Sequence, residues 1–165
     1  MKFSIKTDPS EKQRSDVLVL GVYDSLKIAY DKAILSTSTI SYIASILKHG
    51  DMTGKAGSSL ILYNAPGTKT PKILLIGLGK EKELDGKKYL TAVRAMIYAL
   101  KKMDVKIIAS YIQIAPVIGS DIAWNVEHFI TEVMDASYEF AELKTIDKKT
   151  KKTFDFLVNV DKKNQ

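Results

Sequence analysis

The fold of this chain is decided by the ten residues Pro71-Lys72-Ile73-Leu74-Leu75-Ile76-Gly77-Leu78-Gly79-Lys80. They place four consecutive large aliphatic side chains between a proline and two glycines. An apolar run without alternation is typical of a strand buried on both faces, so we expect helices on both sides of its sheet. Glycines at the carboxyl end of such a strand free the backbone for a sharp turn or for a ligand.

The residues around this strand predict a mixed sheet. A second continuous apolar run, Val17–Tyr23, predicts a central strand, and the turn Asn64–Gly67 predicts an antiparallel hairpin between residues 59–63 and 72–76. Further strands are predicted at residues 2–7, 105–112 and 154–160, and helices at residues 38–48, 85–103 and 121–143. A hairpin beside parallel crossovers gives the fold class three-layer α/β/α with a mixed sheet.

Caps and apolar periodicity define the three helices. Asp85 and Asp121 are the predicted caps of the two long helices, and Ser38 or Thr39 caps the short one. The second long helix is predicted to turn six apolar residues inward: Ile122, Val126, Phe129, Ile130, Val133 and Met134. This spacing repeats with the period of an α-helix, so one face of the helix is expected to pack on the sheet.

Composition restricts the class of protein. The length of 165 residues is enough for about one domain, and 45% apolar with 27% charged residues is typical of a globular protein. No run of about 18 apolar residues is present, so we expect no membrane partner. The chain has no cysteine, which excludes disulfides and thiolate metal sites, and we expect a cytoplasmic location.

The net charge of +6 is unevenly distributed. Residues 69–106 hold ten Lys or Arg residues against four carboxylates, whereas residues 107–140 hold five carboxylates and no Lys or Arg. Two solvated helix faces explain this pattern, and a docking surface for nucleic acid or for another domain is the alternative. The candidate nucleic-acid contacts are Lys80, Lys82, Lys87, Lys88, Lys101 and Lys102.

No residue is assigned a catalytic or metal-binding role. Gly77-Leu78-Gly79-Lys80 could hold a phosphate, but it lacks the third glycine of a dinucleotide fingerprint and the Ser or Thr of a P-loop, so a tight strand exit is favoured. His49 and His128 lack ligand-spaced partners. Asp135 and Glu139 have the spacing of a cation pair, but solvated carboxylates are the commoner explanation.

Several segments together resemble one family. They are Met1-Lys2-Phe3-Ser4-Ile5-Lys6, Glu11-Lys12-Gln13-Arg14-Ser15, Leu20-Gly21-Val22-Tyr23, Gly54-Lys55-Ala56-Gly57, and the run from Ile73 to Asp85. They are similar to the amino-terminal domain of bacterial leucyl (cytosol) aminopeptidases, the metallopeptidases often called aminopeptidase A. The resemblance implies a macro-domain-like fold for this chain.

The resemblance also implies a division of labour between two domains. The family's carboxyl-terminal domain holds two divalent metals, manganese or zinc, and an Asn-Thr-Asp-Ala-Glu-Gly-Arg motif that this chain lacks. We therefore expect a non-catalytic domain with no cofactor of its own, whose full-length form is a homo-hexamer that hydrolyses amino-terminal residues from peptides. The alternative is a DNA-binding or architectural module acting through the basic 69–106 segment.

These expectations divide the chain into four parts. The macro-like core covers residues 1–143, and residues 144–153 form a basic connector. Residues 154–160 are the last strand of the same domain, and residues 161–165 begin the linker to a missing catalytic domain, which is also the main partner of this one.

Overall fold

The computed structural model describes residues 1–9, 13–29, 34–142 and 153–160, without the side chains of residues 139–142. It contains one seven-stranded sheet in the order β1-β7-β6-β2-β5-β4, with the short β3 paired to β2. The strands are β1 (Lys2–Lys6), β2 (Val17–Tyr23), β3 (Ile28–Ala29), β4 (Ser59–Tyr63), β5 (Lys72–Gly79), β6 (Ile107–Ser110) and β7 (Asp155–Asn159). The helices are α1 (Thr37–Lys48), α2 (Gly86–Lys102) and α3 (Ile122–Glu142).

Strands β2 and β5 form the centre of the sheet. They pair in parallel from Val17 opposite Lys72 to Tyr23 opposite Gly79. Every residue of β2 is buried, and so are the six residues 73–78 of β5. The antiparallel hairpin of β4 with β5 is confirmed. On the side away from β5, β2 pairs in parallel with β6. The sheet is therefore mixed.

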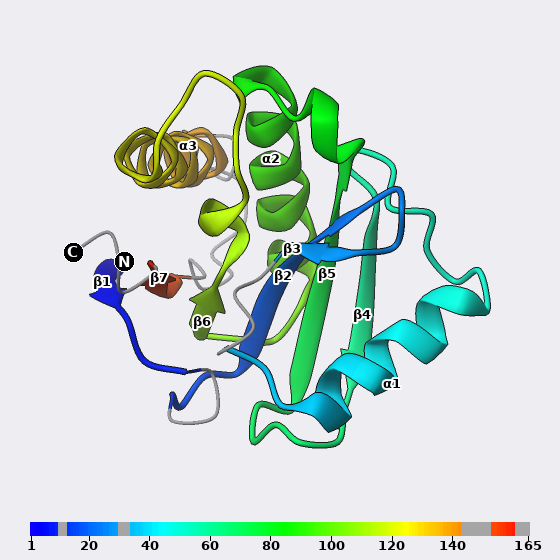
Figure 1. Cartoon of the computed structure of the whole chain (residues 1–165). Coiled ribbons are helices and arrows are strands. Elements are labelled where there is room, and N and C mark those ends of the chain that lie inside the picture. The colour runs from blue at the N-terminus through cyan, green and yellow to red at the C-terminus, as the bar shows by residue number, and fades with distance from the viewer. Residues whose placement is uncertain (10–12, 30–33, 143–152, 161–165) are drawn as a thin grey trace.

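Helices cover both faces of this sheet (Figure 1). The alternation of β2 assigns its side chains to the two faces: Val17 and Val19 join the core with α2 and α3, whereas Leu18 and Leu20 join the core with α1. Two apolar clusters thus lie on either side of one sheet. This is the three-layer α/β/α arrangement expected from the sequence.

Caps define the helix starts, and one predicted cap is wrong. Asp85 accepts a hydrogen bond from the Lys88 amide at 2.9 Å, and Asp121 accepts one from the Trp124 amide at 2.8 Å, as predicted. Helix α1 instead begins after Ser36, whose hydroxyl accepts from the Thr39 amide. Ser36 precedes the predicted caps, and it is the residue with extended backbone angles that a cap requires.

Two further predictions need correction. Strand β6 is shorter than residues 105–112 because the chain turns at Tyr111 into the 3-10 turn Ile112–Ile114. Met134 is 55% exposed rather than inward, since Phe129 and Val133 already fill the contact of α3 with the core. Residues 144–152 of the predicted connector and residues 161–165 of the predicted linker lie outside the described part.

Within the described ranges, no helix is long and apolar enough to cross a membrane.

Among the tyrosines that the structure describes, Tyr23, Tyr89 and Tyr111 are buried. Tyr89 donates to the carbonyl of Asn125 at 2.9 Å, and Tyr111 donates to the carbonyl of Asp8 at 3.2 Å. Burial, helped by the nearby charge of Glu81, raises the pKa of Tyr23 to about 12. Burial also raises the pKa values of Tyr89 and Tyr111 far above the ordinary range, with Asp8 adding to the effect at Tyr111.

These tyrosines should make stability fall in alkali. Each phenol stays neutral in the folded state up to a higher pH than in the unfolded chain, where tyrosine ionises near pH 10. Their contribution is therefore complete below about pH 10 and decreases above it, by about 1.4 kcal/mol per pH unit for each tyrosine. Urea unfolding at increasing pH measures this slope, and Tyr89→Phe should make it shallower. Native ionisation of all tyrosines together near pH 10 would contradict the prediction.

Candidate functional site

The segment for which the sequence left a ligand loop as the alternative to a tight strand exit runs from the end of β5 through the 3-10 turn Glu81–Glu83 to the start of α2. The backbone N–H groups of its two glycines are hydrogen-bonded to a neighbouring loop. The amide of Gly77 donates to the carbonyl of Ser58 at 2.7 Å, and the amide of Gly79 donates to the carbonyl of Gly54 at 2.9 Å. Neither N–H group is left to bind a phosphate.

Close packing explains why residue 77 is glycine. A Cβ atom at this position would lie 1.9 Å from the carbonyl oxygen of Lys55 and 2.2 Å from the hydroxyl of Ser58. Gly79 is needed for a different reason, because its φ of +76° lies in the left-handed region. These contacts agree with the favoured prediction of a tight strand exit. The backbone of the loop at residues 54–58 packs against the carboxyl end of β5 and accepts its last hydrogen bonds.

Alanine substitutions separate the two roles. Gly77→Ala should destabilise the domain by about 3 kcal/mol or more, because overpacking is added to the loss of backbone hydrogen bonds to the loop. In Gly79→Ala the added Cβ would lie an ordinary 3.5 Å from the Cβ of Ala56, so this variant should cost only the left-handed strain of about 1–2 kcal/mol. Chemical unfolding of both variants measures the difference. Equal losses would show that the close approach at residue 77 is unimportant.

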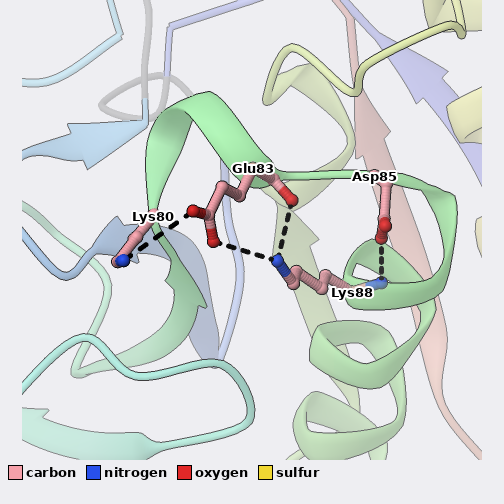
Figure 2. Close-up of polar contacts among 4 residues, drawn as sticks. All are labelled: Lys80, Glu83, Asp85 and Lys88. Carbon is pink, nitrogen blue, oxygen red and sulfur yellow. Dashed lines mark hydrogen bonds and ion pairs between the residues drawn. The ribbon is translucent and has the colours of Figure 1, made fainter.

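Four of the six candidate lysines lie in the segment that leads into the start of α2. Figure 2 shows two of them, Lys80 and Lys88, beside the carboxylate of Glu83. The ammonium of Lys80 lies 3.7 Å from Glu83, and that of Lys88 lies 3.4 Å from the other oxygen of the same carboxylate. Lys88 also donates to the carbonyl of Glu83 at 3.1 Å. Lys82 and Lys87 are exposed, and among the described residues neither lies within ion-pair distance of a carboxylate.

The other two lysines lie at the opposite end of α2, which is about 25 Å long. Lys101 donates to the carbonyl of Ala136 on α3 at 3.2 Å. The ammonium of Lys102 lies over the ring of Tyr98, 4.0 Å from its centroid. The structure therefore brings Lys80, Lys82, Lys87 and Lys88 together and places Lys101 and Lys102 apart from them.

The acidic segment lies beside the basic one. Helices α2 and α3 pack against each other on the same face of the sheet (Figure 1). Arg94 of α2 forms a bidentate pair with Glu132 of α3. The charge asymmetry along the sequence is thus partly cancelled in space. Helix packing accounts for part of the pattern that suggested a docking surface.

Both histidines make local contacts. The Nδ1 atom of His128 lies 2.9 Å from the carbonyl oxygen of Trp124, and its ring stacks on the Trp124 indole with centroids 3.8 Å apart. The Nδ1 atom of His49 lies 2.6 Å from the carbonyl oxygen of Ser45. Among the described residues, no three His, Asp or Glu side chains are grouped as metal ligands.

Sequence reasoning missed a buried amide network at the carboxyl ends of β6 and β7. Asn159 accepts from Gln13 and donates to the carbonyl of Ser110, while Gln113 donates to the carbonyls of Ser110 and Asn159. Asn125 of α3 donates to the carbonyl of Gln113 at 2.9 Å. The available signal was Asn125 itself, an amide on the inward face of α3 four residues before Phe129.

The network joins segments that are distant in sequence. Open α/β sheets usually bind ligands at the carboxyl ends of their strands. Here amide side chains occupy that edge at β6 and β7, and the loop Gly54–Ser58 occupies it at β5. The described arrangement can hold a rigid scaffold together, and none of its buried groups is paired as a nucleophile with a base.

Comparison with known structures defines the class of domain. The chain superposes on a tomato leucine aminopeptidase variant with a TM-score of 0.67 and 20% identity, covering 96% of this chain and 32% of that one. It superposes on a macrodomain of Mycobacterium tuberculosis DarG with a TM-score of 0.63 and 11% identity, covering 95% and 96%. At these identities the likeness shows the fold alone, a macro-like α/β/α domain.

Sequence comparison identifies the family. Residues 19–147 match the model of the cytosol aminopeptidase family, N-terminal domain. The chain is 40% identical over 145 residues to a probable cytosol aminopeptidase of Methylobacillus flagellatus, covering 88% of this chain and 29% of the relative. It is 35% identical over 166 residues to a probable cytosol aminopeptidase of Dechloromonas aromatica, covering 100% and 33%. The chain belongs to the cytosol aminopeptidase family as its amino-terminal domain, and it spans about a third of these relatives.

Proposed function

We propose that this chain is the non-catalytic scaffold domain of a metallo-aminopeptidase that removes amino-terminal residues from peptides. The observation that carries the proposal is the coverage: nearly the whole chain matches its relatives, but it accounts for only 29–33% of their length. The reaction belongs to the remaining part of the protein.

In this proposal the carboxyl-terminal peptidase domain is the partner of the present one. That domain would hold two divalent metals, manganese or zinc, and these would supply the activation of the attacking water. The full-length protein is a cytoplasmic homo-hexamer. The family resemblance supports these features, and the family membership of the chain agrees with them.

The proposal predicts that the chain alone has no peptidase activity. The 165-residue chain, with manganese or zinc added, should hydrolyse leucine p-nitroanilide no faster than buffer does. The full-length Methylobacillus flagellatus relative, measured under the same conditions, should hydrolyse it. Activity of the chain alone would overturn its non-catalytic role, and an inactive relative would overturn the reaction assigned to the whole protein.

DNA binding is the second candidate function, and the exposure of Lys82 and Lys87 supports it. The four lysines around the start of α2 are the better candidate contacts for DNA. At the other end of the helix, Lys101 donates a hydrogen bond to α3 and Lys102 contacts the ring of Tyr98. An interface at the four lysines would contact phosphates without reading bases, so its affinity would depend steeply on salt.

Charge reversal tests this candidate. The double variant Lys82→Glu with Lys87→Glu should weaken duplex binding at low salt. The slope of the logarithm of the binding constant against the logarithm of the salt concentration should fall by an amount that corresponds to about two fewer released counterions. The control is Lys2→Glu with Lys6→Glu, which makes the same charge change on β1. Gel shifts over a range of salt concentrations measure both. Equal binding by the two double variants would show that the lysines near α2 are only a solvated surface.

A further inference from the structure

The two edges of the sheet differ in their chemistry. Strand β1, at one edge, carries Lys2 and Lys6 at its ends. Strand β4, at the other edge, has the sequence Ser-Leu-Ile-Leu-Tyr, and no charged residue occurs from residue 56 to residue 68. Natural sheets usually protect an edge with lysine, proline or a bulge, so β4 is an unprotected edge. Figure 1 shows β4 as the outermost strand on its side of the sheet.

The hydrogen bonds at both ends of β4 show which of its backbone groups point outward. The amide of Asn64 donates to the carbonyl of Pro71 at 2.9 Å, and the amide of Gly77 donates to the carbonyl of Ser58 at 2.7 Å. In an antiparallel ladder, alternate residues exchange hydrogen bonds with the partner strand. Residues 58, 60, 62 and 64 therefore pair with β5, and Ser59, Ile61 and Tyr63 direct their N–H and C=O groups away from it.

These outward groups are available within the described structure. Among the described residues, no hydrogen bond outside the ladders involves the backbone of Ser59, Ile61 or Tyr63. Ser59 and Tyr63 are exposed, the latter at 60%, and Ile61 is half-buried against the core with α2. The edge thus presents three donors and three acceptors beside side chains that solvent can reach.

We propose that β4 pairs antiparallel with β4 of a second copy of this chain, with Ile61 opposite Ile61 on a two-fold axis. Ser59 of each copy then lies opposite Tyr63 of the other, and the outward groups of all three residues are satisfied. Two chains that each carry a net charge of +6 repel one another. A strand without charges is therefore where two copies can meet with least repulsion.

The same geometry limits pairing through the sheet edges to two copies. A two-fold contact uses the β4 edge of both chains, and the extended sheet ends at a β1 strand on each side. Both of these outer edges carry Lys2 and Lys6, which oppose further pairing. A closed dimer follows rather than a fibre.

Lysine substitution tests which edge is used. Sedimentation velocity of the 165-residue chain at increasing concentration should show a dimer. Ser59→Lys with Tyr63→Lys should raise the dissociation constant about tenfold or more, because four extra charges then lie along the shared edge. Ile5→Lys, which adds one exposed lysine per chain to the β1 edge, is the control and should leave the dimer intact.

Either a monomeric parent chain at all concentrations or dissociation only in Ile5→Lys would overturn the proposal. Thermal unfolding of each variant shows whether it is still folded.

A single cysteine tests the register, because the chain has none of its own. In the proposed dimer the two Cα atoms of residue 61 lie about 5.5 Å apart, within the range for a disulfide. Ile61→Cys should therefore form a disulfide-linked dimer on oxidation. Tyr63→Cys should not, because its two copies are offset by four residues, about 13 Å. Efficient linkage through residue 63 but not 61 would exclude this pairing.

Discussion

The parallel pairing of β2 with β5 is the interaction on which the other elements depend. Both strands are buried on both faces, so they can exist only if helices cover each side. The odd residues of β2 set the position of α2 and α3, and the even residues set that of α1. Two further segments are placed by β5. Strand β4 forms an antiparallel hairpin with it, and residues 54–58 hydrogen-bond to it near Gly77, at its carboxyl end.

The elements whose signals are local could be predicted from the sequence. Uninterrupted aliphatic runs identified β2 and β5, and Asp85 and Asp121 marked the starts of α2 and α3 because a cap acts within one turn. The end of β6 and the exposure of Met134 could not be predicted in this way. The strand ends where the chain turns into Ile112–Ile114, and Met134 is exposed because Phe129 and Val133 make the core contact, and the apolar pattern alone shows neither.

The candidate site shows the same limit. The glycines of residues 77–79 indicated a special backbone, but their sequence could not show that the loop Gly54–Ser58 already uses both amides. The burial of Gln13 and Asn159 could not be predicted, because polar residues in loops and at strand ends are usually solvated. Charge patterning located the lysines, and only the fold revealed Glu83 and α3 as their neighbours.

The position of β7 has a consequence for how the domain is made. Strand β7 lies between β1 and β6 and is parallel to both, so in the described structure β1 pairs with a strand 153 residues later in the chain. A nascent chain that lacks β7 leaves β1 and the outer side of β6 with open edges on the ribosome. The β1 edge of the sheet is therefore completed last. Because pairing between strands so far apart in sequence is slow, we expect this step to be the slow one in folding.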